Sequence, residues 1–281
     1  MNNAVTCHSI ESFHSHGINQ INTFLSLWPK ECKFLVLIDD LESSDNIYKK
    51  YDWDKNRIIL TKFDNRDLNN FKTKHTKKKF NGFKYIHYSK TINPLRFLWR
   101  LRFFQYTFMF DVCKFSHKVF AMYEASKYFE EGMLFWLDGD LITHSIVDDI
   151  FFDMFRNPFK ISYHLDRSNP SYTETGFIAF NLDHKHSEVF FEKWISYYTK
   201  SLFLKLSDGW TDCHTYDSTR KDIGLTYFHN LTSVDCHHPL INCFLGNYFD
   251  HLKGSRKSEG KSAREGDRII QDAHPYWNDN V

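Results

Sequence analysis

The sequence predicts an α/β fold with a mostly parallel central sheet flanked by helices. Apolar runs at residues 3–8 and 32–38 are predicted strands, and the second is nearly continuous, as expected of a strand covered on both faces. Between them, residues 18–28 place apolar side chains at helical spacing until Pro29 ends the pattern. Because a strand, a helix and a second strand in succession are typical of a parallel crossover, this opening favours a parallel sheet.

The rest of the chain continues the alternation. Strands are expected at residues 57–60, 134–137, 160–165 and 176–182, and helices at residues 115–130, 146–155 and 187–205. With 281 residues, 42% of them hydrophobic, the chain is long enough to bury a sizeable core, so we expect a single domain over residues 1–281. Residues 61–90 are expected to form a lysine-rich loop, and residues 258–281 a polar C-terminal tail.

Composition and cysteine usage argue against several classes of protein. A net charge of +1 argues against a protein that coats nucleic acid. The six cysteines form no CxxC pair, which indicates reduced thiols in a cytoplasmic protein. The sequence has no N-terminal signal pattern and no apolar stretch of membrane-spanning length. The basic and aromatic residues 95–110 favour either packing against the sheet or peripheral contact with a membrane, which would be the inner membrane face.

Two carboxylates follow the predicted strand at residues 134–137. Asp138 and Asp140 are separated by Gly139, which lets the backbone turn without a Cβ clash. In open α/β sheets, ligands bind beyond the carboxyl ends of the strands. Two hard oxygen ligands at such an edge suit Mg²⁺ or Mn²⁺, and the metal would hold a diphosphate. The alternative is a solvated acidic loop in which the triplet occurs by chance.

A second group of polar residues lies far downstream. His251 is able to complete a metal site begun by two carboxylates, because a neutral imidazole binds the same ions. Gly254 would let the loop approach a phosphate closely, and Lys257 would neutralise phosphate charge. Taken alone, the segment would be a basic surface loop with an incidental histidine. The aspartate pair upstream is what favours the metal site.

These two motifs resemble those of nucleotide-sugar glycosyltransferases with the GT-A fold. The triplet at 138–140 matches their DxD metal motif, and the spacing His251-x-x-Gly254-x-x-Lys257 is similar to the C-terminal motif of the glycogenin-like and lipopolysaccharide galactosyltransferase group. The resemblance implies that His251 is the third protein ligand of Mn²⁺ and that Lys257 contacts the donor diphosphate. It also implies a single catalytic domain, a nucleotide sugar as donor, and a glycan acceptor that is lipid-linked if the enzyme works at a membrane.

Further donor-binding positions follow from the resemblance. Lys118, on the helix before the acidic triplet, would face the diphosphate of the donor. Thr6, Cys7 and His8 stand at the end of the first predicted strand, and Asp39 follows the second. In such enzymes these strand ends contact the nucleoside base and the ribose.

The resemblance also implies acidic residues near the transferred sugar. Glu174 begins a Glu-Thr-Gly sequence where the family often has Asn-Ala-Gly, and the family's usual Asp-Gln pair is not intact around Asp208 and Asp212. An inverting enzyme needs a carboxylate base on the acceptor hydroxyl, for which Asp212 and Glu174 are candidates. A retaining enzyme would not require a classical base, so the stereochemical outcome stays open.

Two other functions are compatible with the sequence. The Asp-Cys-His and Asp-Cys-His-His segments at 212–214 and 235–238, with His164 and Asp166, offer ligands for a zinc-dependent or two-metal hydrolase, although their spacing matches no compact zinc motif. A non-catalytic nucleotide-binding protein would keep the pocket without turnover. The preferred hypothesis is a metal-dependent glycosyltransferase of the hexosyltransferase type that transfers a sugar from a nucleotide-diphosphate donor to a hydroxyl acceptor.

Overall fold

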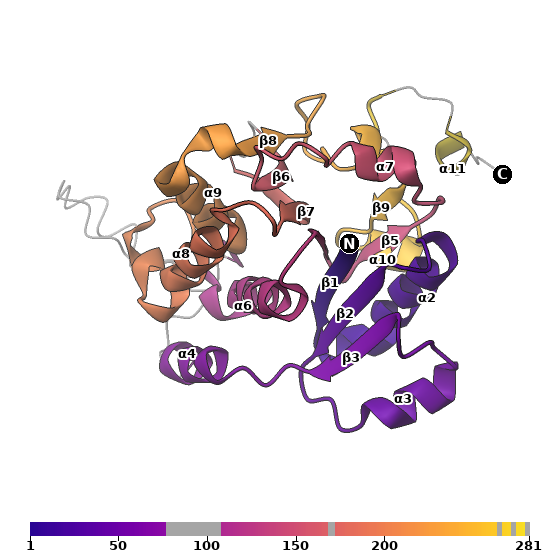
Figure 1. Cartoon of the computed structure of the whole chain (residues 1–281), viewed down its shortest axis with the longest axis horizontal. Helices are drawn as coiled ribbons and strands as arrows, with labels where there is room; N and C mark the ends of the chain where they lie inside the picture. The colour runs from indigo at the N-terminus through magenta and orange to yellow at the C-terminus, as the bar shows by residue number, and fades with distance from the viewer. Residues whose placement is uncertain (77–107, 168–171, 263–265, 271–273, 279–281) are drawn as a thin grey trace, which may run out of the picture.

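A seven-stranded sheet with the order β3-β2-β1-β4-β7-β6-β8 forms the centre of the molecule (Figure 1). This computed structural model describes residues 1–76, 108–167, 172–262, 266–270 and 274–278. The strands of the sheet are β1 (Asn2–His8), β2 (Lys33–Ile38), β3 (Ile58–Lys62), β4 (Met133–Leu137), β6 (Ser162–Leu165), β7 (Glu174–Asn181) and β8 (Phe228–Asn230). A separate two-stranded sheet pairs β5 (Leu141–Thr143) with β9 (Phe249–His251).

All strands of the large sheet except β7 run in one direction. β1 pairs in parallel with β2 and β4, and β2 pairs in parallel with β3. β7 is antiparallel to both β4 and β6, whereas β8 is parallel to β6. The expected α/β fold with a mostly parallel central sheet is therefore confirmed. Because β7 is reversed and its Phe177 pairs with Leu137, the first residues of β7 lie at the edge where the parallel strands end.

Helices cover both faces of this sheet. They are α1 (Ile10–Ser12), α2 (Ile18–Leu27), α3 (Ser44–Tyr51), α4 (Arg66–Thr76), α6 (Val112–Phe129), α7 (Asp149–Asp153), α8 (Ser187–Thr199), α9 (Asp212–Ile223), α10 (Arg256–Glu259) and α11 (Pro275–Asn278). Buried side chains of α2 and α7 belong to one core, and those of α4, α6, α8 and α9 belong to another. In Figure 1, α4, α6, α8 and α9 accordingly lie on the side of β1 opposite to α2.

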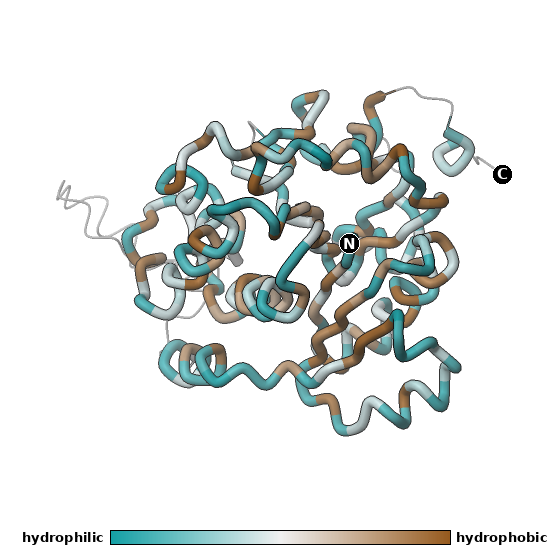
Figure 2. The backbone as a smooth tube through the Cα atoms, viewed as in Figure 1, coloured by the Kyte–Doolittle hydropathy of each residue, from teal (hydrophilic) through white to brown (hydrophobic). Residues whose placement is uncertain are grey.

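The two cores alternate along the central strands. Phe34, Val36 and Ile38 of β2 belong to the core shared with α2, and Leu35 and Leu37 belong to the core shared with α6. Successive side chains of a strand point to opposite faces, so a strand covered on both sides must be apolar at every position. Figure 2 shows this in the brown colour of β1 to β3, whereas the peripheral α3 is mainly hydrophilic.

The stretch expected as a lysine-rich loop at residues 61–90 begins with regular structure. β3 extends to Lys62, and residues 66–76 form α4. Leu68 and Phe71, three positions apart on one face of α4, are buried in the core shared with α6 and α8, which explains the helix. Residues 77–90, and the basic and aromatic stretch up to residue 107, lie outside the described residues. Within the described part of the chain, no helix is long and apolar enough to cross a membrane.

Two expected helices are shorter than their patterns suggested, and several helices, α9 among them, were not expected. The segment at 187–205 is helical only to Thr199, because Ser201 has a left-handed backbone (φ 55°) and a 3₁₀ turn follows. α7 begins after Asp148, whose side chain accepts a hydrogen bond from the Phe151 amide (3.1 Å). α9 is mostly polar, so its sequence carries little helical periodicity.

The described part of the expected C-terminal tail packs against the body of the molecule. The Tyr276 hydroxyl donates to Asp250 Oδ2 (2.8 Å), and Trp277 Nε1 donates to the Gly246 carbonyl (2.7 Å). Asp250 is the residue before His251 in β9 and is fully buried. These contacts attach α11 to the segment that carries the predicted histidine ligand.

Candidate metal centre

The acidic triplet forms a turn at the end of β4, beside the start of β7. The Asp138 amide donates to the Gly176 carbonyl (2.9 Å), and the Asp138 carbonyl accepts from the Leu141 amide (2.8 Å) and from Gln20 Nε2 (2.7 Å). The backbone of the turn is therefore held by β7, by its own hydrogen bond and by α2. Such support keeps the two carboxylates in defined positions.

The pairing of β5 with β9 brings the distant histidine to this turn. β5 begins at Leu141, directly after the triplet, and Leu141 lies opposite His251 in the antiparallel register. The Leu252 amide donates to the Asp140 carbonyl (3.0 Å), which extends the contact beyond β9. His251 and Asp140 thus become neighbours through a short strand pairing, although 111 positions separate them in the sequence.

The side chains of Asp138, Asp140 and His251 converge. His251 Nε2 lies 3.0 Å from Asp140 Oδ1 and 3.7 Å from Asp138 Oδ2, and one potential ligand atom from each residue falls within a 4.8 Å span. No second group of three such residues was found among the described parts of the chain. Two carboxylate oxygens and one imidazole nitrogen fit Mn²⁺ or Mg²⁺, with room for further oxygen ligands from a substrate.

The orientation of Asp138 is set by two donors. Trp136 Nε1 and Lys118 Nζ each lie 2.7 Å from Asp138 Oδ1. With Oδ1 engaged in this way, the other oxygen, Oδ2, is the one that faces His251. Outer partners of this kind orient metal ligands and tune their basicity.

The His251 ring occupies a space that only glycine at position 176 leaves open. A Cβ at Gly176 would lie 2.5 Å from His251 Nδ1 and closer still to Cε1. The ring is 3% exposed, and its Nδ1 has no hydrogen-bond partner among the described residues. The nearest acceptor is Glu174 Oε1, at 3.7 Å from Nδ1. A metal-bound histidine usually donates its second ring nitrogen to such a carboxylate.

Glu174 is itself held by two cations. Arg167 Nη1 lies 3.0 Å from Glu174 Oε2, and Lys253 Nζ contacts the same oxygen. Burial raises the pKa of Glu174, but the charges of Lys253, His251 and Arg167 outweigh it and hold that pKa below its usual range. Glu174, which the sequence suggested as a general base, is thus ionised, buried and paired with Arg167 and Lys253.

Lys118 links Asp138 to Asp212. Its Nζ lies 2.8 Å from Asp212 Oδ2 and also donates to the Thr175 carbonyl (2.9 Å). Burial lowers the pKa of Lys118, yet the charges of Asp138 and Asp212 reverse that effect and raise the pKa well above its usual value. Asp212, only 1% exposed, also accepts a hydrogen bond from the Thr175 hydroxyl. Lys118 and Asp212 therefore both belong to the surroundings of the triplet.

Lys257 reaches the centre from α10, the short helix that follows β9. Its Nζ lies 3.0 Å from Asp140 Oδ2, while 41% of the side chain stays exposed. Burial raises the pKa of Asp140, but His251 and Lys257 together lower it further than burial raises it. Gly254 has a left-handed backbone (φ 60°), which lets the loop turn back towards the triplet.

The residues expected to contact the nucleoside lie at the ends of β1 and β2. Thr6 and His8 are buried, whereas Cys7 and Asp39 are partly exposed. Burial raises the pKa of the Cys7 thiol, so it stays protonated. Burial also raises the pKa of Asp39, but His117, whose Nε2 lies 3.0 Å from Asp39 Oδ2, contributes to a net lowering. Nucleoside contact at these positions stays a prediction.

Gly139 has a packing role that its sequence context did not indicate. A Cβ at Gly139 would lie 2.6 Å from His8 Cε1, so the imidazole ring of His8 fills the space beside the turn. His8 Nε2 is 3.1 Å from Gln20 Oε1, and Gln20 also bonds the Asp138 carbonyl. Burial lowers the pKa of His8 to about 4, so the ring is neutral at pH 7. His8 thereby supports the acidic triplet by packing against Gly139.

Not every residue predicted from sequence joins this network. Asp208 is exposed, and its carboxylate accepts a hydrogen bond from the Ser207 hydroxyl (2.9 Å). His164 and Asp166 lie 3.2 Å apart, but together with the segments at 212–214 and 235–238 they form no metal-binding cluster among the described residues. The ligand set considered for a hydrolase is therefore not assembled.

Arg167 and Gln20 are absent from the residues predicted for the site, whereas Lys253 lies in the segment whose basic residues were expected to neutralise phosphate charge. Arg167 and Lys253 anchor Glu174, and Gln20 anchors the acidic turn. Lys253 lies two residues after His251, and its charge is the feature of the sequence that indicates a role at the site. Gln20 sits in an ordinary helical pattern, and Arg167 follows a predicted strand without any motif.

Comparison with known proteins finds similarity only among solved structures. No family model and no curated protein matches the chain. It is similar to apo mouse xyloside xylosyltransferase 1 at 12% identity and a TM-score of 0.46, over 82% of this chain and 85% of that one. It is also similar to a glycosyltransferase involved in glycosylation of the PBCV-1 major capsid, at 10% identity and a TM-score of 0.47, over 92% and 95% of the two chains.

A third similar structure is the glycosyltransferase GlyE of Streptococcus pneumoniae TIGR4. Identity is 15% and the TM-score 0.46, over 82% of this chain but only 46% of GlyE, which is longer. These similar structures are glycosyltransferases. The chemistry of the site follows from the arrangement of Asp138, Asp140 and His251.

Proposed function

We propose that the protein is a metal-dependent glycosyltransferase that moves a sugar from a nucleotide-diphosphate donor to a hydroxyl of a glycan acceptor. The observation that carries the proposal is the convergence of Asp138, Asp140 and His251 within 4.8 Å at the carboxyl edge of the parallel strands. Two lysines, Lys118 and Lys257, lie against this group. Anionic ligands of α/β sheets bind at such an edge.

The three residues would hold Mn²⁺ or Mg²⁺, and the bound ion would neutralise charge on the diphosphate leaving group. Asp138 Oδ2, Asp140 Oδ1 and His251 Nε2 already face one another without it. The unpartnered Nδ1 of His251 supports this assignment, because it is free to donate to Glu174 when Nε2 is engaged. Glu174 would then be a positioning residue.

Lys257 would stabilise the developing charge on the diphosphate. Its side chain is 41% exposed and its Nζ contacts Asp140 Oδ2, so the ammonium is able to turn towards a ligand. Interactions that strengthen as the leaving group gains charge lower the barrier as well as aid binding. Lys118 is more deeply placed between Asp138 and Asp212, and would act mainly by orienting Asp138.

Asp212 is the remaining candidate for a group near the transferred sugar. It is buried and paired with Lys118, which favours a positioning or electrostatic role over that of a free base. A hexose as the transferred sugar, and an acceptor that is lipid-linked at the inner membrane face, complete the proposal. These features depend on the sequence resemblance rather than on any contact described above.

The test is a thermal-shift and calorimetric titration with uridine, guanosine and cytidine diphosphates, each with and without Mn²⁺. A ligand that binds only the folded state raises its stability. We expect one diphosphate to stabilise the wild-type protein in the presence of Mn²⁺, and Asp140→Ala to abolish that effect while keeping the fold. Asp45→Ala, which removes an exposed carboxylate 72% accessible to solvent, serves as the matched control.

Turnover is then measured with the nucleotide sugars of the base that binds. Release of nucleoside diphosphate that requires Mn²⁺ and Asp140 is the expected result. Binding without release would favour a non-catalytic nucleotide-binding protein. Tightly held zinc in the purified protein, together with metal-independent nucleotide release by Asp140→Ala, would overturn the proposal.

A further inference from the structure

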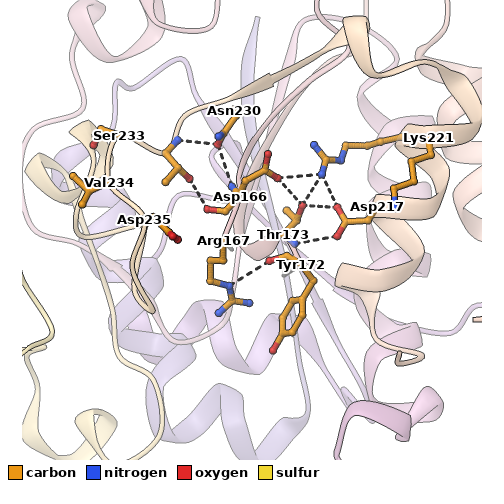
Figure 3. A pocket seen from close by; sticks show the side chains of 12 residues that line it. Asp166, Arg167, Tyr172, Thr173, Asp217, Lys221, Asn230, Ser233, Val234 and Asp235 are labelled. Atoms are coloured by element: carbon orange, nitrogen blue, oxygen red, sulfur yellow. Dashed lines mark hydrogen bonds and ion pairs between the residues drawn. The ribbon is translucent and has the colours of Figure 1, made fainter. Parts of the chain in front are cut away.

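A hollow of about 550 Å³ is lined in part by Arg167, which contacts Glu174 near the candidate metal centre (Figure 3). It lies between the residues that follow β6, the start of β7, the second half of α9 and the segment after β8. Its lining consists of Asp166, Arg167, Tyr172, Thr173, Asp217, Arg220, Lys221, Asn230, Thr232, Ser233, Val234 and Asp235. The volume is within the range of pockets that bind small molecules.

Arg167 connects this pocket to the metal centre. Its side chain lines the pocket, and its Nη1 lies 3.0 Å from Glu174 Oε2. The other oxygen of Glu174 lies 3.7 Å from His251 Nδ1. Two side-chain contacts therefore lead from the pocket wall to a proposed metal ligand. The pocket therefore lies on the side of Glu174 away from His251, within two side-chain contacts of the proposed metal site.

The wall of the pocket is preorganised by Arg220. Its Nη2 donates to Asp217 Oδ1 (2.7 Å), to the Thr173 hydroxyl (3.0 Å) and to Asp166 Oδ1 (3.1 Å), as the dashed lines in Figure 3 show. Its Nη1 contacts the buried His164. Both terminal nitrogens of Arg220 are thus engaged by the protein, and they hold the carboxylates of Asp166 and Asp217 in place.

The opposite rim is held by side chains of the segment after β8. Asn230 Oδ1 accepts from the amides of Asp166 (3.1 Å) and Thr232 (2.9 Å), and the Thr232 hydroxyl donates to the Asp166 carbonyl (2.9 Å). Figure 3 shows Asn230 and Asp166 facing each other across these bonds. Both walls are therefore fixed before any ligand enters, which lowers the entropic cost of binding.

The chemistry of the lining indicates the class of ligand. Three carboxylates (Asp166, Asp217, Asp235) face three cationic side chains (Arg167, Arg220, Lys221), so the pocket has no excess charge to attract an ion. Of the twelve lining residues, Val234 alone is aliphatic, so an apolar ligand would leave many polar groups unpaired. An uncharged molecule with many hydroxyl groups satisfies both donors and acceptors.

We propose that this pocket binds the saccharide acceptor. The proposal rests on the proposed glycosyl transfer and adds where the acceptor lies and that it is an uncharged sugar. An acceptor hydroxyl oxygen forms a bond to the anomeric carbon of the donor sugar. The bond from that carbon to the diphosphate oxygen breaks, and its electron pair leaves with the diphosphate. The hydroxyl proton passes to a carboxylate or to the departing diphosphate.

The test fills the pocket and measures sugar binding separately from donor binding. The probes are the methyl glycosides of glucose, galactose, mannose and N-acetylglucosamine. Their binding is measured by saturation-transfer NMR in the absence of a donor. We expect at least one glycoside to bind wild-type protein, and Ser233→Trp to weaken that binding at least tenfold. Lys221→Trp, at an exposed position on α9, is a second blocking variant in case the first does not fold.

A control variant separates blocking from disturbance. Thr226→Trp adds the same bulk at an exposed position outside the pocket lining, and should bind glycosides normally. All variants should keep wild-type affinity for the nucleoside diphosphate with Mn²⁺.

The outcomes distinguish the two proposals. If wild-type protein binds nucleoside diphosphate but none of the glycosides, or if both blocking variants bind glycosides as well as wild type, the pocket is not the acceptor site and the proposed function stands. If glycosides bind in the pocket but no diphosphate binds with Mn²⁺, the proposed glycosyl transfer fails, and the pocket's role as an acceptor site fails with it.

Discussion

The substitution Gly176→Ala tests the metal centre through packing alone, since it removes no ligand. The added Cβ would lie 2.5 Å from His251 Nδ1, whereas non-bonded heavy atoms settle at about 3.5 Å or more. The ring therefore has to move by about 1 Å. Metal–ligand distances tolerate roughly 0.2 Å, so a shift of this size displaces Nε2 from its position beside Asp140.

We expect Gly176→Ala to lower Mn²⁺ affinity by about 10- to 100-fold, the range for disturbing the support of a metal ligand. Forcing a methyl group into a packed site also costs on the order of 1–3 kcal/mol of unfolding free energy. The affinity is measured by titrating Mn²⁺ and following its free electron paramagnetic resonance signal. The unfolding free energy comes from urea titration of the same preparations.

A double-mutant cycle with His251→Ala isolates the mechanism. Once the imidazole is absent, the nearest remaining atom given for the methyl group at position 176 is Glu174 Oε1, 2.9 Å from the built Cβ. Gly176→Ala should then cost almost no further Mn²⁺ affinity in the His251→Ala background. Additive losses in the double variant, or wild-type Mn²⁺ affinity in Gly176→Ala, would refute the idea that glycine is needed to seat the ring.

Three further outcomes follow from single side chains. Lys257→Ala should weaken nucleoside diphosphate binding by about 1–3 kcal/mol in calorimetry, because a charged hydrogen bond is lost. Lys261→Ala should leave the binding unchanged. Equal affinity in both variants would contradict the role of Lys257 in diphosphate binding. Lys118→Met should lower the unfolding free energy by about 3–5 kcal/mol, since it leaves buried carboxylates unpaired. Lys127→Met, which removes a 47% exposed side chain from an ion pair, should lower the unfolding free energy by under about 1 kcal/mol. Similar losses in the two variants would refute the distinction between the buried and the exposed lysine. Burial lowers the pKa of His144 to about 4, so below pH 6.5 the unfolded chain binds a proton that the folded chain does not. The unfolding free energy should therefore fall by up to about 3 kcal/mol between pH 6.5 and 4, and it should fall less steeply in His144→Phe. The same pH dependence in both proteins would exclude a contribution from His144.

Helix α4 shows one limit of reading this sequence. The lysine cluster of residues 72–79 overlaps the end of α4 and suggested a loop, yet Leu68 and Phe71 bury one face of the helix against α6 and α8. Two apolar residues in a polar stretch form too weak a periodic signal to predict a helix, because tertiary contacts rather than propensity stabilise it.

The surroundings of the metal centre show another limit. Lys118 was predicted to face a diphosphate, and it lies between Asp138 and Asp212. Asp212 and Glu174 were candidates as general bases, and both are buried in ion pairs. Residue type indicates what a side chain is able to do, but its partners depend on elements that meet only in the folded chain.

Neighbouring residues alone were enough to predict the buried strands and the chemical types of the candidate metal ligands. Continuous apolar runs predicted the buried strands, and an acidic triplet after one of them predicted where oxygen ligands would emerge, because both follow from neighbouring residues. Tertiary structure decided that His251 joins them. The antiparallel pairing of Leu141 with His251, the reversal of β7 and the space left by Gly176 all depend on contacts between segments far apart in the chain. Such contacts are set by the packing of the whole core, and no local pattern encodes them.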